Sequence, residues 1–161
     1  MTIKVGERLP NATFTLMGAD GPETRTTEDF FSGRRVILFG VPGAFTPTCH
    51  RNHLPGFITK SDEFKAKGID EIAVTSVNDV FVMKAWEKDT DATGKVTFLA
   101  DGSGSFAKAV GLSLDLSERG LGLRSQRYSM LVDDGVLRKL NIEEAPGKAD
   151  LSGADAILAQ I

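Results

Sequence analysis

The apolar run Val36–Val41, which stops at Pro42-Gly43, narrows the possible folds more than any other feature of the chain. A continuous apolar run of this length, closed by a turn, is typical of a strand that is buried on both faces of a sheet. Two later segments also fit strands, since Ile69–Val77 is rich in β-branched residues and Val96–Ala100 is a third buried run, and sequence of helical type separates them. We therefore expect three parallel strands that are connected by helices.

The other expected elements fit around these strands. They are a strand at Thr13–Leu16, a turn at 19–22, a helix from Thr46-Pro47 to about Gly68 that breaks or kinks at Pro55, a helix at Val80–Lys88 capped by Asn78 or Asp79, a short helix at Phe106–Val110, an irregular segment at Gly111–Ser125, a hairpin of Tyr128–Val132 and Val136–Ile142, and a closing helix at Ala154–Ile161. Pro and Gly punctuate these elements, and Asp133-Asp134-Gly135 is a strong hairpin signal. The pattern predicts an α/β fold with a mixed central sheet flanked by helices, in a single domain spanning residues 1–161.

Charge and hydropathy restrict the partners and the compartment. The net charge is −3, without a long block of one sign, which argues against nucleic acid or a membrane surface as the main partner. The longest apolar runs are far too short to span a bilayer. The N-terminal sequence lacks a positive-then-apolar signal pattern, so we expect a cytoplasmic protein whose thiol stays reduced.

Cys49 is the only cysteine among 161 residues. If Thr46 is the N-cap and Pro47 the first helical residue, Cys49 lies in the first turn, near the positive end of the helix dipole. The Thr46 hydroxyl is expected either to accept from a first-turn N–H or to donate toward the sulfur. A lone cysteine is also often an inert, buried small side chain, and these residues leave both readings open.

A helix N-terminus alone does not suffice to stabilise a thiolate. It contributes about 0.3–1 kcal/mol, and about 2 kcal/mol at most, while burial acts in the opposite direction. A cation at about 4 Å contributes about 4 kcal/mol at an effective dielectric constant of about 20. Arg51 points away from Cys49, and His53 shares its helix face but is expected to be mostly neutral. Arg127 is the best candidate, because a strand antiparallel to Val36–Val41 would begin beside Cys49.

The residues around Cys49 resemble a known family. Pro42, Thr46 and Cys49 fit the Pro-x-x-x-Thr/Ser-x-x-Cys signature of peroxiredoxins. The longer stretch "VPGAFTPTCHRNHLPGF" is similar to the type II, or peroxiredoxin-five-like, branch. Further similar stretches are "SVNDVFVMKAW", "FLADGSGSFAKAVGL" and "LRSQRYSMLVDDGVLRKLNIE", which are spread over nearly the whole chain.

The resemblance implies a thioredoxin-like fold and a thiol peroxidase that needs no cofactor. It implies that Cys49 is the peroxidatic cysteine, with Thr46 and Arg127 as catalytic residues beside it. The product is the Cys49 sulfenic acid. Pro42 is expected to shape the pocket and shield the sulfenic acid, and Phe45 to form an apolar mouth that admits alkyl hydroperoxides as well as hydrogen peroxide.

The chain departs from those relatives that carry a second, resolving cysteine. No cysteine lies between Ala145 and Ala159, and Val74 occupies the other position at which relatives carry one. An external thiol must therefore reduce the sulfenic acid. Glutathione with glutaredoxin is the family's usual solution for one-cysteine members, and thioredoxin is the main rival. Members of the branch commonly form homodimers, here through a contact that would include Phe45–Pro47.

Other functions of the same residues remain open. Cys49 and His53 are also the residue types of a Cys-His hydrolase or transferase, although nothing near in sequence would orient His53. A sensor that passes oxidation to a partner is a third possibility. His53 itself is more readily a structural histidine near a dimer contact than a group that tunes the thiolate. A metal site at Cys49 and His53 is not expected, because further ligands are missing nearby.

Overall fold

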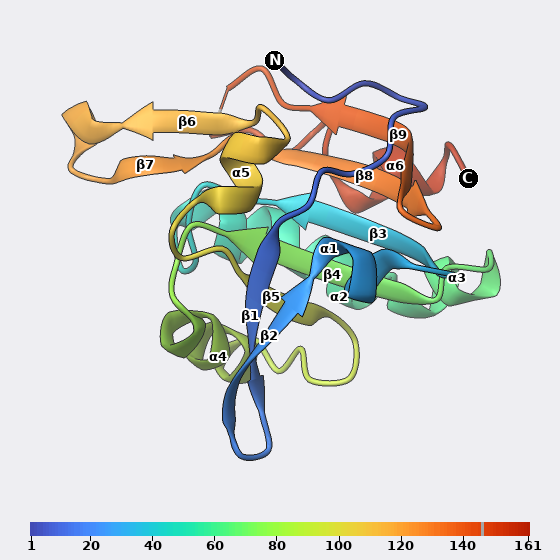
Figure 1. The fold of residues 1–161 in the computed structure, drawn as a ribbon, viewed down its shortest axis with the longest axis horizontal. Coiled ribbons are helices and arrows are strands. Elements are labelled where there is room, and N and C mark those ends of the chain that lie inside the picture. Colours follow the sequence, from blue (N-terminus) through green and yellow to red (C-terminus); the bar gives the residue numbers. More distant parts are fainter. Residues whose placement is uncertain (146) are drawn as a thin grey trace.

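A computed structural model describes residues 1–145 and 147–161 of the chain, and a mixed β-sheet forms its centre (Figure 1). Within the described residues the sheet has seven strands in the order β2-β1-β5-β4-β3-β8-β9. Its strands are β1 (Thr13–Gly18), β2 (Gly21–Thr26), β3 (Arg35–Gly40), β4 (Glu71–Ser76), β5 (Thr97–Ala100), β8 (Tyr128–Asp133) and β9 (Val136–Ile142).

Strands β3, β4 and β5 are parallel to one another, as the three buried runs predicted. Strand β8 pairs antiparallel with β3, and Gly40 at the end of β3 lies opposite Tyr128 at the start of β8. The hairpin of β8 and β9 was also predicted correctly. This pairing places whatever precedes β8 next to whatever follows β3.

Helices cover both faces of the sheet, which confirms the predicted α/β architecture. The helices are α1 (Thr27–Phe31), α2 (Leu54–Thr59), α3 (Ser61–Ala66), α4 (Val80–Asp89), α5 (Ser105–Ala109) and α6 (Ala154–Leu158). Successive side chains of β3 point to opposite faces, so β3 contributes to two cores. Ile37 and Phe39 pack with residues of α2, α3, α4 and α6, whereas Val36 and Leu38 pack with residues of α1 and α5.

The helix that carries Cys49 begins at Pro47, as predicted, but its course is irregular. Residues Cys49–His53 form a turn of π-helix, η1, in which the Leu54 N–H reaches back to the Cys49 carbonyl. Pro55 explains the irregularity. It has no N–H for the turn before it, and its ring would collide with a carbonyl in a regular α-helix, so the widened turn accommodates it. Helix α2 continues directly from η1 and ends at Thr59.

Two predictions of local structure were wrong. Gly111–Ser125, expected to be irregular, forms a separate hairpin of β6 (Ser113–Leu116) and β7 (Gly122–Ser125), joined through the 3₁₀ turn η2 (Ser117–Arg119). These strands are too short to give a clear alternating pattern. The turn expected at 19–22 overlaps the start of β2, and no strand was expected at 23–26. Strand β2 is an exposed edge strand of polar residues, and its pairing with β1 rather than its hydropathy establishes it. Figure 1 shows the β6–β7 hairpin at one side of the main sheet.

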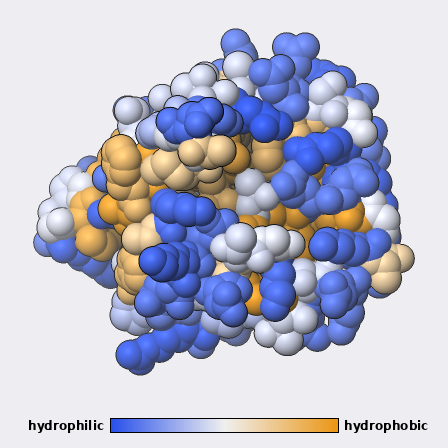
Figure 2. All heavy atoms as spheres, turned by 90° about the horizontal axis from the view of Figure 1, so that it is seen from below, coloured by the Kyte–Doolittle hydropathy of each residue, from blue (hydrophilic) through white to orange (hydrophobic). Residues whose placement is uncertain are grey.

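The surface has a mixed character. Figure 2 shows the molecule from below the view of Figure 1, and on this face hydrophobic residues lie among hydrophilic ones. Among the residues described, the structure contains no helix with the length and apolar character required to cross a membrane.

Candidate active site

Cys49 and Arg127 meet at the carboxyl end of β3. Arg127 immediately precedes β8, and the β3–β8 pairing brings it beside the first helical turn after β3. Its Nη2 donates a hydrogen bond to the Cys49 sulfur over 2.9 Å. This is the position that antiparallel pairing of the two strands predicts for Arg127. The cation beside Cys49 therefore comes from a residue that is distant in sequence but precedes the strand paired with β3.

The pair is enclosed in the protein interior. Cys49 has no exposed surface, and Arg127 is only 2% exposed. A buried guanidinium needs hydrogen-bond partners and, best, an opposite charge. At about 4 Å, even with an effective dielectric constant of about 20, one positive charge favours a neighbouring anion by about 4 kcal/mol. The contact therefore places a permanent positive charge directly against the sulfur.

His53 lies on the other side of the guanidinium. Its Nδ1 is 3.0 Å from Arg127 Nη1, and its Nε2 is 2.8 Å from the Ser152 carbonyl oxygen. A guanidinium can only donate and a carbonyl can only accept, so Nδ1 is the acceptor and Nε2 carries the proton. His53 is therefore neutral. Burial, and then the charge of Arg127, lower the pKa of His53 to about 3.

Thr46 holds the turn that leads to Cys49 in a way the sequence did not predict. Its hydroxyl donates to the Gly43 carbonyl over 2.6 Å, so its proton is not directed at the sulfur. Its own carbonyl accepts from the His50 N–H over 2.8 Å and starts the helix. The turn is tight, because Phe45 within it has a φ of 64°, in the left-handed region that side chains rarely adopt.

Pro42 and Phe45 occupy different environments. Pro42 is buried, and its carbonyl accepts a long hydrogen bond of 3.4 Å from Arg124 Nη1. Phe45 is 45% exposed, and its ring lies over His50 with 5.8 Å between centroids. The roles of these two residues at the mouth of a substrate pocket stay predictions.

Three residues near the site were not anticipated from the sequence. Arg124 of β7 contacts the loop after β3, while Glu143 and Ser152 approach from the C-terminal segment. Because residues 111–125 were expected to be irregular, the sequence did not place Arg124 beside this loop. Glu143 follows a strand and Ser152 lies in a loop, and neither carries a motif that local pattern could identify.

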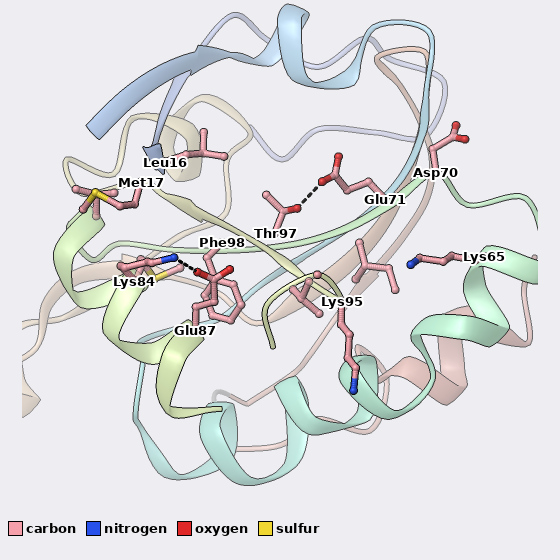
Figure 3. A pocket seen from close by; sticks show the side chains of 15 residues that line it. Leu16, Met17, Lys65, Asp70, Glu71, Lys84, Glu87, Lys95, Thr97 and Phe98 are labelled. Atoms are coloured by element: carbon pink, nitrogen blue, oxygen red, sulfur yellow. Dashed lines mark hydrogen bonds and ion pairs between the residues drawn. The ribbon is translucent and has the colours of Figure 1, made fainter. Parts of the chain in front are cut away.

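A pocket of about 310 Å³ lies elsewhere, between α4 and the starts of β4 and β5 (Figure 3). Glu71 is hydrogen-bonded to Thr97 there, and Lys84 is paired with Glu87. None of its lining residues belongs to the Cys49 site. Within the described part of the chain, no group of His, Cys, Asp and Glu side chains is arranged to hold a metal ion.

Comparison with known proteins places this geometry in a family. Residues 4–158 match the family model described as Redoxin. Peroxiredoxin-2C of Oryza sativa subsp. japonica is 48% identical over 157 residues, with 97% of this chain and 96% of the relative covered. The chloroplastic peroxiredoxin-2E of Arabidopsis thaliana is 45% identical, with 98% and 69% covered.

A solved structure agrees with this assignment. The crystal structure of reduced Prx3 from Vibrio vulnificus in complex with H₂O₂ is 49% identical, covers 99% of both chains and has a TM-score of 0.94. The likeness extends over the whole sheet and includes the region of Cys49. The chain therefore belongs to the peroxiredoxins, the thiol-dependent peroxidases of the redoxin group, as a type II member with a single cysteine.

Proposed function

We propose that this peroxiredoxin reduces hydrogen peroxide and alkyl hydroperoxides at Cys49. The thiolate attacks one peroxide oxygen, the O–O bond breaks, and the other oxygen leaves as hydroxide or alkoxide, which takes up a proton. Cys49 becomes the sulfenic acid. The hydrogen bond from Arg127 to the Cys49 sulfur is the single observation that carries the proposal. That the related Vibrio protein was crystallised with H₂O₂ supports the choice of substrate.

Arg127 is proposed to act on both charges of the reaction. Its permanent charge stabilises the thiolate before attack and the developing negative charge on the peroxide oxygens during attack. Thr46 is proposed to shape the turn through its bond to Gly43 and to offer its oxygen to the substrate. Pro42 and Phe45 are proposed to form the apolar surroundings of the peroxide.

The proposed reductant is glutathione, with glutaredoxin, rather than thioredoxin. The chain holds one cysteine, so an external thiol must condense with the sulfenic acid to give a mixed disulfide and water. A second thiol then releases the Cys49 thiol and forms the external disulfide. Because Cys49 has no exposed surface, the first turn of its helix must move before a tripeptide thiol can reach the sulfur.

We further propose a cytoplasmic homodimer built from single domains spanning residues 1–161. Phe45 and Pro47 are exposed beside the site and offer a surface for the contact between subunits. Relatives of this chain include a chloroplastic protein, so the location needs measurement by itself. Size-exclusion chromatography with light scattering tests the dimer.

The geometry disfavours a Cys-His hydrolase. Nδ1 of His53 is occupied by Arg127 and Nε2 by the Ser152 carbonyl, so neither nitrogen is placed to take a proton from Cys49. Stoichiometry distinguishes the peroxidase from a redox sensor, because a sensor would consume only about one equivalent of peroxide even with a thiol reductant present.

A single panel of reactions tests the proposed function. The wild type and Cys49→Ser are mixed with hydrogen peroxide or an organic hydroperoxide, each with glutathione and glutaredoxin or with the thioredoxin system. We expect repeated turnover by the wild type with glutathione and glutaredoxin, and none by Cys49→Ser. Peroxide consumption by Cys49→Ser at the wild-type rate contradicts the role of Cys49, and turnover with thioredoxin alone contradicts the proposed reductant.

A further inference from the structure

A line of hydrogen bonds, buried from Ser152 inward, leads from the C-terminal segment to the reactive sulfur. The Glu143 carboxylate accepts from the backbone N–H groups of residues 150, 151 and 152, at 3.2, 3.1 and 2.8 Å, and from the Ser152 hydroxyl at 2.6 Å. The Ser152 carbonyl then accepts from His53. His53 in turn accepts from Arg127, whose other nitrogen reaches Cys49.

We propose that His53 is a positioning residue that holds the Arg127 guanidinium against the Cys49 sulfur. Glu143 is the outer member of this line, because it orders the turn whose carbonyl orients His53. The inference rests on the proposed roles of Cys49 and Arg127 and assigns to their site two residues that never touch the peroxide.

Contacts with His53 and Cys49 both constrain the plane of the guanidinium. Nη1 is bound to His53 and Nη2 to the sulfur, and the planar fork cannot rotate without losing one of them. Loss of the His53 acceptor would remove one of the bonds that hold Nη2 against the sulfur. The Arg127 carbonyl is also tied to this region, because it accepts from the Glu143 backbone N–H over 2.9 Å.

A neutral acceptor suits this position better than a carboxylate. A carboxylate beside Nη1 would orient the guanidinium but would also neutralise its field at the sulfur. His53 orients the group and leaves its charge directed at Cys49. The Ser152 carbonyl is essential to this arrangement, because it keeps the proton on Nε2 and the lone pair on Nδ1.

Aromatic packing holds the imidazole itself. The His53 ring lies 5.0 Å from the Phe39 ring and 5.6 Å from the Phe57 ring, between centroids, and is 1% exposed. Phe39 comes from β3 and Phe57 from α2, so sheet and helix together set the ring plane. Arg127 and Glu143 are the charged groups that act on His53.

Substitutions at His53 separate positioning from packing. His53→Phe keeps the aromatic packing but removes both hydrogen bonds. His53→Asn retains an amide oxygen near the place of Nδ1, and His53→Gln retains an amide donor near the place of Nε2. His50→Asn is the matched control, since it preserves an acceptor for the Trp86 indole N–H outside the line.

The rate of Cys49 sulfenic acid formation is measured by rapid mixing with hydrogen peroxide and trapping with dimedone. We expect His53→Phe to be slower by about 10- to 100-fold, the loss that follows when a reacting group is displaced by about 1 Å. His53→Asn should recover most of the rate and His53→Gln much less. The rates should follow the presence of an acceptor for Arg127 and not the order of unfolding free energies, which a purely structural role would follow.

Glu143→Gln and Ser152→Ala test the outer member. Glu143→Gln places an amide donor against backbone donors and should slow the peroxide step by about 3- to 10-fold, less than His53→Phe, because Glu143 affects the guanidinium only through His53. Ser152→Ala removes only the hydroxyl contact and leaves three backbone bonds to Glu143, so it should stay close to wild type.

The outcomes distinguish this inference from the proposed function. If Cys49→Ser is inactive and Arg127→Ala is slow, but His53→Phe matches His50→Asn, the positioning role is wrong and the function stands. If His53→Asn is no faster than His53→Gln, the role is also wrong, and this pair decides the question should His53→Phe fail to fold. An active Cys49→Ser would instead refute the proposed function.

Discussion

Arg127 donates from Nη2 to the sulfur of Cys49 over 2.9 Å, across 78 positions of sequence. Neither residue is near the other along the chain, and they meet because β8 begins where β3 ends. The contact converts a helix-start cysteine with a weak local field into one with a permanent charge against its sulfur. Each prediction below tests one part of that arrangement.

Arg127 should be the largest single contributor to the peroxide step after Cys49. Loss of a donor to a developing oxyanion costs about 10²–10³-fold in rate, so Arg127→Ala should slow sulfenic acid formation by about that factor. Arg127→Lys keeps the charge but loses the planar pair of donors, so its rate of sulfenic acid formation should lie between those of wild type and Arg127→Ala. Single-turnover rates measure this.

Arg51 provides the control for that substitution. It lies on the helix of Cys49 and is exposed, so Arg51→Ala should remain within about two-fold of wild type, as surface substitutions usually do. An equal loss of rate in Arg51→Ala and Arg127→Ala would mean that the rate of sulfenic acid formation depends on net charge and not on the contact between Arg127 and Cys49.

Thr46 should contribute through its hydroxyl. Thr46→Val is nearly isosteric but cannot donate to the Gly43 carbonyl, so the turn that carries Phe45 should loosen and the peroxide rate should fall by about 10-fold. Thr46→Ser should behave like wild type. Thr48→Val is the matched control, because its hydroxyl binds the Gly147 carbonyl away from the sulfur. Equal rates for Thr46→Val and Thr46→Ser would remove the hydroxyl from the mechanism.

Stability should depend on pH through His53. The folded protein lowers the pKa of His53 from 6.5 to about 3, so the unfolded chain binds a proton first as the pH falls. His53 therefore adds nothing to pH dependence above about pH 6.5. Between about 6.5 and 3 it lowers the free energy of unfolding by up to about 1.4 kcal/mol per pH unit.

Denaturant unfolding at a series of pH values measures this slope. The slope in His53→Asn should be smaller than in wild type, whereas His50→Asn should retain the wild-type slope. The comparison between variants matters because Glu143, whose pKa the fold lowers, also loses stabilisation as the pH falls. Identical slopes in wild type and His53→Asn would show that His53 is not held neutral.

Gly40 should be required for the junction of β3 and β8. A methyl group there would overlap the ring of Tyr128, the residue after Arg127. Overpacking of this kind costs about 1–3 kcal/mol, so Gly40→Ala should lower the free energy of unfolding by that amount and slow the peroxide step. In Gly56→Ala, the added methyl group in α2 makes only ordinary contact with Ala154. The free energy of unfolding of this variant should therefore be unchanged or slightly higher. Wild-type stability in Gly40→Ala would mean that the Tyr128 ring moves aside freely.

Much of the fold could be predicted because its central signals are local. Continuous apolar runs identify the buried strands, Pro47 starts the helix of Cys49, and Asp79 caps α4 by accepting from the Val82 N–H. The antiparallel pairing of β3 and β8 was a condition of the placement of Arg127, and the structure has this pairing. With that pairing, the sequence identifies Arg127 as the best candidate for the cation beside Cys49, and the structure contains the contact.

Strands whose main stabilisation is backbone pairing, and not burial of apolar side chains, were missed. Strand β2 carries polar residues and exists because β1 pairs with it, and β6 and β7 are each too short to signal a strand before they pair. Pattern along the chain measures burial, and these strands are stabilised mainly by backbone bonds to a neighbour. Local sequence does not record such bonds.

The chemistry of Cys49 depends on both kinds of information. Residue types and spacing determined a thiol at a helix start, a threonine at the turn and an external route for reduction. The tertiary structure decided which acceptor each donor binds: Thr46 donates to the Gly43 carbonyl, His53 to the Ser152 carbonyl and Arg127 to the Cys49 sulfur. Hydrogen bonds form between groups that the fold brings within about 3 Å, and sequence separation carries no information about such distances.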